Sequence, residues 1–372
     1  AYQGDGVSGI YIWGAQLTES AKPLPYVKTL DVAVTKTFAE TLRTEYDAVT
    51  GENLGALIEG ASTNLCTHSE TMGSTGWHTG SLDTILQNVK KAPDDTFSMN
   101  SITSGATIGS SYIRRDLPLV SGVTYTVSVY ASSNDTFTTG NVIKVTSPSD
   151  GSLLTIGLAT AGLTSETKRY TGTFTSNTTE THYIYFGVDA DANKTIEVWG
   201  AQFEALPFAS SYIRTEGSAV SRSSDNLSVS PYVAINPSET SFNVVFDSAS
   251  PITDWAAGFK HNALNSEHYV LYPSGGAITV MHISTDSVIG TSGSWVVGEV
   301  QNFSGTYDGA TSKLYVNKVF NSQDAISQPL VINPDMPLYI GMGSSNYQVI
   351  NGHISKFSTY AQALTQQEIT LL

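Results

Sequence analysis

Polar and apolar residues alternate along much of the chain with the period of two that a half-buried β-strand produces. Residues 124–129 read Thr-Tyr-Thr-Val-Ser-Val, and residues 241–246 read Ser-Phe-Asn-Val-Val-Phe. The stretch from His182 to Val188 is an almost continuous aromatic and aliphatic run, which predicts a strand covered on both faces. We therefore expect an all-β protein.

Tight-turn residues separate the predicted strands, as in a sandwich of antiparallel strands. Asp308-Gly309 and Asn351-Gly352 are turn dipeptides of this kind. At the C-terminus, Thr365 and Glu368 have the spacing of a capping box, which predicts a short helix through Leu372. Ile369 and Leu372 would pack against the edge of the sandwich.

An internal repeat sets the predicted domain organisation. Residues 10–38 align without a gap onto residues 196–224, and both copies contain Trp-Gly-Ala-Gln, beginning at Trp13 and at Trp199. Each copy has the pattern of a closing strand followed by an exit loop. The predicted units are the final strand and exit of a preceding sandwich module at 1–38, a connector with room for a short hairpin at 39–60, a complete module at 61–216 and a second β unit at 217–372.

Composition excludes several classes of partner. The chain has 372 residues, a length that favours two or three domains. It carries 18 Lys and Arg against 33 Asp and Glu, for a net charge of −15, which repels phosphate backbones and excludes nucleic acid as the main partner. No apolar run is long enough for membrane insertion. The single cysteine, Cys66, can form no internal disulfide and is expected to be a small buried residue.

Motifs of enzymatic chemistry are missing from the sequence. It contains no Gly-x-Ser-x-Gly elbow, no phosphate-binding loop and no His-Glu-x-x-His helix. It also lacks the short rung repeats of a parallel β-helix. We therefore predict a protein without enzymatic activity.

Aromatic residues beside polar or glycine-rich loops are candidates for sugar binding, because an exposed ring can stack on a sugar. The candidate carbohydrate-binding residues are Trp77, Trp255, Tyr269, Trp295 and Tyr347. The alternative for the tryptophans is packing in the core or at its edge. For Trp13 and Trp199, repetition at one place in two modules favours a core position, in step with Leu17 and Phe203 respectively.

Two segments resemble known families. Residues 55–65 resemble a sequence motif of phage tail-fibre and other virion proteins. In those proteins the motif precedes a carbohydrate-binding-module-like jelly roll, and here it reads Gly-Ala-Leu-Ile-Glu-Gly-Ala-Ser-Thr-Asn-Leu. The matching end is at residues 198–204 and 210–215. Residues 217–372 resemble a laminin-G or concanavalin A-like lectin domain, through Gly305-Thr306-Tyr307-Asp308-Gly309 and Leu338-Tyr339-Ile340-Gly341. One departure is Asn317-Lys318, where that family usually has Asn-Gly.

The resemblance implies tandem antiparallel β-sandwiches, a jelly roll followed by a concanavalin A-like sandwich. It also implies a bacteriophage tail-fibre or receptor-binding protein on the exterior of the virion. Such a protein would be a homotrimer that contacts host-surface polysaccharide and other virion proteins. Two alternatives stay open, a purely structural or decorating virion protein and a secreted bacterial adhesin.

Calcium is the one cofactor that the laminin-G resemblance brings in, because such domains often hold one ion through Asp and backbone oxygens. The weak candidate ligands are Asp247, Asp254, Asp286 and Asp308, with no ligand pair that the sequence can align. The spacing of the histidines matches no standard metal-ligand frame, so the sequence predicts no metal site.

Overall fold

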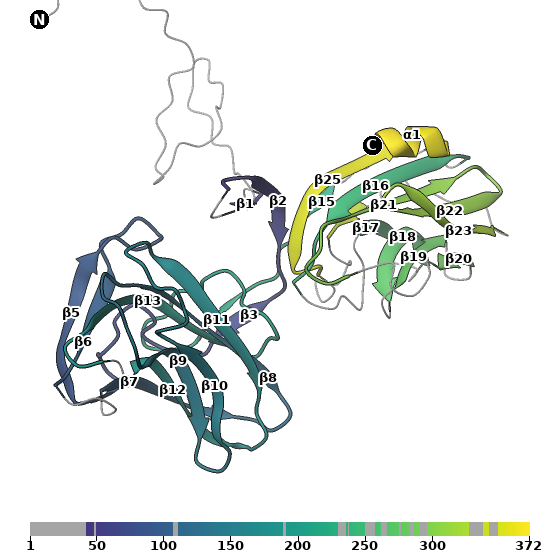
Figure 1. Cartoon of the computed structure of the whole chain (residues 1–372). Helices are drawn as coiled ribbons and strands as arrows, with labels where there is room; N and C mark the ends of the chain where they lie inside the picture. The colour runs from purple at the N-terminus through teal and green to yellow at the C-terminus, as the bar shows by residue number, and fades with distance from the viewer. Residues whose placement is uncertain are drawn as a thin grey trace, which may run out of the picture. The chain divides into compact units, whose positions relative to one another are not determined.

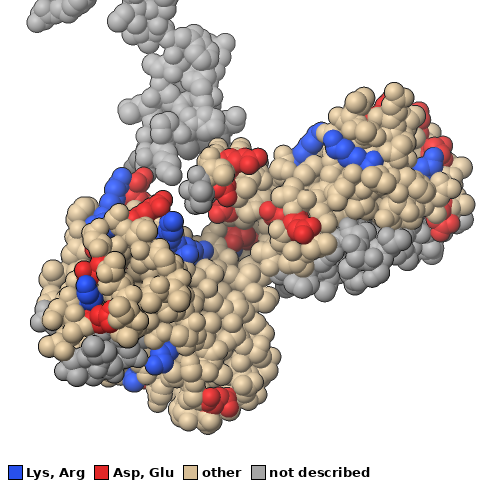
Figure 2. Space-filling model, viewed as in Figure 1, with Lys and Arg blue, Asp and Glu red and all other residues tan. Residues whose placement is uncertain are grey.

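The computed structural model describes residues 42–47, 50–106, 111–188, 191–229, 236, 238–249, 257–261, 266–274, 277–282, 286–289, 296–326, 338–341 and 349–372. For the strands between residues 257 and 289 the structure describes the backbone and not the side chains. The predicted strand and exit at 1–38 lie outside this part of the chain. Within it, no helix is long and apolar enough to span a membrane. Figure 2 shows charged side chains in small separate groups on a mostly uncharged surface, in keeping with 14% charged residues.

The first sandwich consists of two five-stranded antiparallel sheets (Figure 1). One has the order β10-β9-β12-β7-β4, with strands Gly151–Gly157, Asn141–Ser147, Glu180–Val188, Tyr112–Leu119 and His78–Gly80. The other has the order β11-β8-β13-β6-β5, with strands Lys168–Thr175, Thr124–Ser132, Thr195–Glu204, Met99–Ser104 and Leu82–Lys90. A short pair, β3 (Ser62–Asn64) and β14 (Val220–Arg222), brings the ends of this region together.

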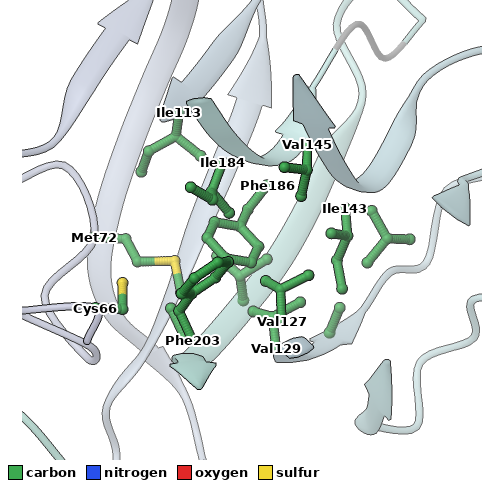
Figure 3. Packing of buried hydrophobic residues seen from close by; sticks show 14 of the residues in the cluster. Cys66, Met72, Ile113, Val127, Val129, Ile143, Val145, Ile184, Phe186 and Phe203 are labelled. Atoms are coloured by element: carbon green, nitrogen blue, oxygen red, sulfur yellow. The ribbon is translucent and has the colours of Figure 1, made fainter. Parts of the chain in front are cut away.

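The core of this sandwich comes from the alternating apolar positions of the facing strands (Figure 3). Val127 and Val129 of β8 pack in one cluster with Ile184 and Phe186 of β12, and all four are almost fully buried. Cys66 belongs to the same cluster, and burial raises the pKa of its thiol to about 12, although the charge of Arg115 acts in the opposite direction. The predicted buried cysteine is confirmed.

A β-bulge in β13 changes the side on which Trp199 lies. The register of β13 against β8 shifts between Trp199 and Gln202, at a glycine with φ +66°. As a result Phe203 enters the core between the sheets, whereas Trp199 packs with Tyr130 and Tyr212 in a separate cluster. Trp199 is 2% exposed, which confirms its predicted burial, but it does not share a face with Phe203.

The second sandwich pairs a seven-stranded sheet with a six-stranded one. The larger sheet has the order β1-β2-β25-β16-β21-β22-β23, with strands Thr44–Tyr46, Asn53–Ile58, Gly352–Tyr360, Thr240–Phe246, Gln301–Tyr307, Thr311–Val316 and Val319–Ala325. The smaller has the order β15-β24-β17-β18-β19-β20, with strands Ser228–Val229, Leu338–Ile340, Ala257–His261, Ser266–Ser274, Ala277–His282 and Asp286–Ile289. The all-β fold of antiparallel sandwiches is therefore as predicted.

Residues 53–58 of the predicted connector complete the larger sheet. β1 and β2 form a hairpin, and β2 pairs with β25 through Ala56 and Ile354. Gly55 allows this approach, because a Cβ there would lie 2.3 Å from the Ile354 carbonyl oxygen. The connector thus contains more than its own hairpin, since it supplies two strands to a sheet whose other strands follow the first sandwich. The module bounds otherwise stay predictions.

Local turn and helix chemistry follows the sequence closely in the second sandwich. Asn317 and Lys318 both have positive φ, 49° and 69°, between β22 and β23, so Lys occupies the turn position where Gly is usual. The short helix α1 (Gln366–Leu371) begins at Thr365 with both bonds of the predicted capping box. Ile369 is fully buried against Tyr315, as predicted for the end of the chain.

Candidate functional site

The outward side of sheet β10-β9-β12-β7-β4 carries a group of aromatic and charged side chains. Strand periodicity puts Ile113 and Ile184 into the core, so their alternate neighbours lie on the outer side. These neighbours are partly exposed, unlike the buried isoleucines. We call this group the tyrosine face; it consists of Tyr112, Arg114 and Asp116 of β7 with Tyr183 and Tyr185 of β12.

The register of β7 against β12 brings the tyrosine face together. Arg114 lies opposite Tyr185, and Asp116 lies opposite Tyr183. The Arg114 guanidinium carbon is 4.4 Å from the centre of the Tyr183 ring, 5.7 Å from that of Tyr112 and 5.9 Å from that of Tyr185. One cation therefore gathers three rings through cation–π contacts.

Asp116 fixes the guanidinium in place. Arg114 donates from Nε to Oδ1 of Asp116 over 2.7 Å and from Nη2 to Oδ2 over 3.1 Å. Partial burial acts to lower the pKa of Arg114, but hydrogen bonds to Asp116 and Tyr185 outweigh it and raise that pKa above its ordinary value. His78 of the neighbouring β4 lies 3.5 Å from Asp116 through Nε2. The cation is thus held in one orientation on the face.

Gly80 of β4 makes room for the outermost ring. A Cβ at this position would lie 2.2 Å from Cε1 of Tyr112, so the ring lies over the bare glycine backbone. Tyr112 in turn meets Tyr185 edge to face, with ring centroids 5.8 Å apart and an angle of 86° between the planes. On the other side of β12, Lys144 and Thr146 of β9 lie opposite Tyr185 and Tyr183.

This arrangement can bind a hydroxyl-rich ligand. Tyrosine rings offer apolar surface that stacks on a sugar, and their hydroxyls offer both donors and acceptors. Arg114 and Asp116 add a fixed donor and a fixed acceptor, with side chains 21% and 28% exposed. A partly exposed face of this kind provides binding contacts without a buried reaction chamber.

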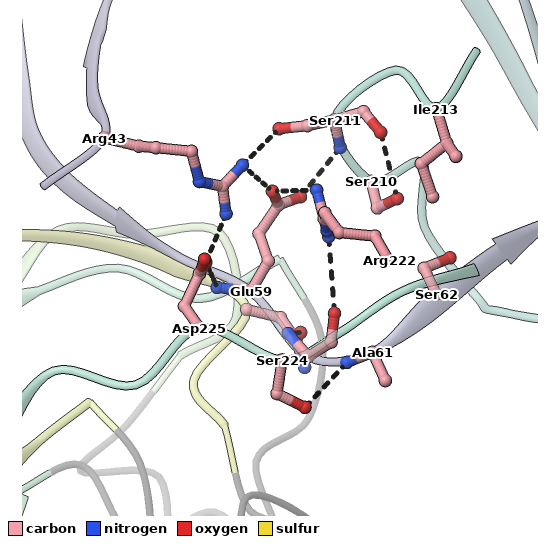
Figure 4. Close-up of polar contacts among 12 residues, drawn as sticks. Arg43, Glu59, Ala61, Ser62, Ser210, Ser211, Ile213, Arg222, Ser224 and Asp225 are labelled. Carbon is pink, nitrogen blue, oxygen red and sulfur yellow. Dashed lines mark hydrogen bonds and ion pairs between the residues drawn. The ribbon is translucent and has the colours of Figure 1, made fainter. Parts of the chain in front are cut away.

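A second polar group, shown in Figure 4, surrounds the buried carboxylate of Glu59. Arg43 and Arg222 reach it over 2.6 and 2.7 Å, and the Ser211 backbone N–H donates to it over 2.8 Å. Burial acts to raise the pKa of Glu59, but the bonds from Ser211 and the charge of Arg222 lower it overall. Arg43 also pairs with Asp225. Because each member already has protein partners, we assign this cluster a structural role.

Of the five tryptophan and tyrosine candidates, Trp77 is the one whose side chain lies in the described part of the structure. Trp77 is 8% exposed and packs in the core of the first sandwich, edge to face with Phe186. That position corresponds to the alternative of core packing. Tyr269 lies in β18. Trp255, Trp295 and Tyr347 fall outside the described residues.

Two of the four candidate calcium ligands, Asp247 and Asp308, have protein partners of their own. Asp247 accepts hydrogen bonds from the His353 backbone N–H and faces His353 Nδ1 at 3.0 Å. Asp308 accepts hydrogen bonds from the backbone N–H groups of Ala310 and Thr311 in the turn after β21. Asp286 lies in β20, and Asp254 falls outside the described residues. Among the described residues, no three His, Cys, Asp or Glu side chains gather as metal ligands.

Sequence reasoning missed the tyrosine face. The pattern was present, since Tyr112-x-Arg114-x-Asp116 and Tyr183-x-Tyr185 each place their members on one side of a strand. The pattern could not show that these two strands are neighbours. The prediction that residues 182–188 form a strand covered on both faces is wrong, because Tyr183 and Tyr185 are partly exposed on its outer side.

Comparison with known proteins supports the fold. Residues 207–370 match the sequence model of the concanavalin A-like lectin/glucanases superfamily, of the laminin-G type. No curated protein sequence matches the chain. The second sandwich accordingly has the concanavalin A-like, laminin-G fold.

Three solved structures illustrate the structural likenesses. A putative carbohydrate-binding protein from Bacteroides ovatus is 12% identical, with 72% of this chain and 80% of that chain covered at a TM-score of 0.32. The tandem CBM22 domains of Xyn10C from Paenibacillus barcinonensis are 10% identical, with 82% and 99% covered at 0.31. The sialidase of Trypanosoma rangeli is 14% identical, with 36% of this chain covered at 0.29, and the match spans only 22% of the sialidase.

Proposed function

We propose that this chain is a non-enzymatic carbohydrate-binding protein and that the tyrosine face of the first sandwich is a glycan-binding surface. The observation that carries the proposal is the gathering of three tyrosine rings around Arg114 on the outer side of a rigid sheet. Rings held on strands lose little conformational freedom when a sugar stacks on them, because neighbouring strands already fix their orientation. The match of residues 207–370 to the concanavalin A-like lectin/glucanases superfamily supports carbohydrate recognition by the second sandwich as well.

We further propose that the protein is a phage tail-fibre or receptor-binding component that contacts bacterial surface polysaccharide. The resemblance of residues 55–65 to a sequence motif of virion proteins supports a place in a phage particle, as does the repeat of residues 10–38 at 196–224. A homotrimer would present each weak binding face three times, and linked copies bind a repetitive polysaccharide far more tightly than one face does.

Binding by the full chain to purified capsule and lipopolysaccharide of candidate hosts tests the proposal. A glycan array identifies the ligand, and titration calorimetry with calcium and with EDTA measures its affinity. Removing a stacking ring costs about 1–3 kcal/mol, by analogy with bases stacked on aromatic side chains. We therefore expect Tyr183→Ala and Tyr185→Ala to weaken binding by about tenfold or more.

Matched controls come from aromatic residues that are exposed elsewhere. Tyr46, in the β1–β2 hairpin, is 58% exposed, and Phe97, in the loop between β5 and β6, is 64% exposed. Tyr46→Ala and Phe97→Ala should bind as the unaltered chain does. Equal losses in all four variants, or saturable binding that the two face variants leave unchanged, would remove the tyrosine face from the proposal.

The alternative is a structural or decorating virion protein that uses the same sandwiches for protein–protein contacts. In that case the tyrosine face would be covered by a neighbouring protein in the particle. No saturable binding to any polysaccharide of a susceptible host, together with protection of Tyr183 from chemical modification in intact virions, would favour this alternative.

A further inference from the structure

Asp116 binds the Nε–Nη2 edge of the Arg114 guanidinium, the edge with which an arginine can recognise a carboxylate ligand. The two bonds from Nε and Nη2, over 2.7 and 3.1 Å, form the side-on fork that gives arginine its preference for carboxylate ligands. Both residues lie on β7, two positions apart, so the strand itself holds the pair on one face. The tyrosine face therefore carries a built-in carboxylate.

The rest of the Arg114 guanidinium, outside the fork, faces other partners. Arg114 packs over the Tyr183 ring, and a hydrogen bond with Tyr185 contributes to its raised pKa. Guanidinium has further N–H donors beyond those in the fork, and Asp116 has further lone pairs. A sugar hydroxyl can use both, since it accepts from one group and donates to the other.

A ligand carboxylate meets a different environment at the same place. It must either displace Asp116 from the fork or bind beside a second carboxylate of the same charge. Lys144 brings positive charge to one edge of the face, but an ammonium lacks the planar fork that matches a carboxylate. The net charge of −15 on the whole chain also disfavours an anionic polymer.

From this geometry we infer that the tyrosine face selects neutral, hydroxyl-rich glycans and rejects carboxylated ones, with Asp116 as the residue that determines this specificity. The inference rests on the proposed function and names the class of sugar that the same face takes. Asp116 is thus a specificity-determining residue that also positions Arg114.

Pairs of oligosaccharides that differ only at C6 test the inference in the full chain. Each pair combines a neutral glucan or galactan oligomer with its uronic acid counterpart, and calorimetry measures both dissociation constants. For the unaltered chain we expect the neutral member of every pair that binds to be at least about tenfold tighter, since hydrogen bonds to charged groups are worth that much. Asp116→Asn keeps the shape of the side chain, removes its negative charge and replaces one of its two acceptors with a donor, so one arm of the fork is freed. In this variant the uronic acid member should gain about tenfold in affinity.

A double variant shows whether the gain uses the fork. In Asp116→Asn/Arg114→Gln the gain for uronic acids should disappear, whereas Asp116→Asn/Lys144→Gln should retain it. Asp116→Thr serves as a second opening variant, and far-UV circular dichroism verifies that each variant is folded.

Failure of the inference and failure of the proposed function give different results. If the unaltered chain binds a uronic acid as tightly as its neutral counterpart, or if the opening variants leave the ratio unchanged, the inference is wrong while the binding function stands. If the unaltered chain binds no member of any pair and no host polysaccharide, the proposed function is wrong and the inference falls with it.

Discussion

The two sheets of the first sandwich treat their outer sides differently, although both carry a tyrosine with an arginine over its ring. On the β8–β13 sheet, Arg169 lies 5.5 Å from the centre of the Tyr130 ring. On the β7–β12 sheet, Arg114 lies 4.4 Å from that of Tyr183. A later segment of the chain packs against the first pair, although Tyr130 and Arg169 stay partly exposed, whereas the second pair lies on the outer side of its sheet.

The cover consists of residues 205–216, which we call the exit segment. Its Tyr212 ring packs 4.4 Å from Trp199. Arg169 donates to the Ser210 carbonyl over 2.7 Å, and Glu204 accepts the Ser210 hydroxyl over 2.5 Å. Polar side chains on that outer side are consequently buried and bonded, including Gln202, Glu204, Ser128 and Thr126.

Coverage therefore decides what the same kinds of residue do. Under the exit segment, rings and polar side chains supply packing and hydrogen bonds, of which those of Gln202 and Glu204 with Ser210 are buried, and substitutions should cost stability. On the tyrosine face, similar residues remain partly exposed, and substitutions should cost binding. The predictions below separate these two consequences.

The largest expected effect is on the covered side. Trp199→Ala removes a 2% exposed ring from contact with Tyr130 and Tyr212, so the free energy of unfolding should fall by about 3–5 kcal/mol. Urea unfolding of the full chain, followed by circular dichroism, measures the change. Tyr183→Ala is the comparison and should cost less than about 1 kcal/mol. A reversed order of the two costs would contradict the distinction between covered and open sides.

Much of this fold could be predicted from local pattern. The alternation at 124–129 and the capping box at Thr365 depend only on neighbouring residues. The structure confirms the strand and the cap, although the polar positions Thr126 and Ser128 are buried and the strand is not half-exposed. The bulge at Gly200 could not be read, because a period of two placed Trp199 and Phe203 on one side. Strand partners were also hidden, since the pairing of Ala56 with Ile354 joins residues at opposite ends of the described chain.

The candidate site depended on the same missing information. An outward Tyr-x-Arg-x-Asp strand looks alike in sequence whether another segment covers it or not. The chosen tryptophans were judged by their loops, yet burial of Trp77 follows from its packing on Phe186, far along the chain. Only the pairing of β7 with β12 brings Arg114 to Tyr183.

The second prediction concerns pH, because a histidine between two carboxylates links the β1–β2 hairpin to the rest of the larger sheet. His353 lies between Asp247, at 3.0 Å, and Glu45, at 2.7 Å. These two carboxylates raise the pKa of His353 to about 9, above its ordinary 6.5. The resulting stabilisation, about 1–2 kcal/mol, is present in full below about pH 6.5 and is lost as the pH rises through about 9.

Hydrogen exchange of the peptide covering residues 44–58 measures this effect, after correction for the intrinsic pH dependence of exchange. Protection should fall between pH 7 and 10, while amides around Trp199 keep theirs. In His353→Gln the loss with pH should be absent. An equal fall in protection in that variant would assign the pH dependence to other groups.

The smallest expected difference compares the two arginines directly. Arg169→Ala removes two part-buried hydrogen bonds, to the Ser210 carbonyl and the Ser128 hydroxyl, and should cost about 2 kcal/mol of stability. Arg114→Ala removes a partly exposed ion pair and should cost less than about 1 kcal/mol. Glycan affinity should change in the opposite order, with a loss for Arg114→Ala and none for Arg169→Ala. Unfolding curves and calorimetric titrations on the same two proteins measure both orders. If one variant lost both stability and affinity while the other lost neither, coverage by the exit segment would not be what separates structural from binding residues in this sandwich.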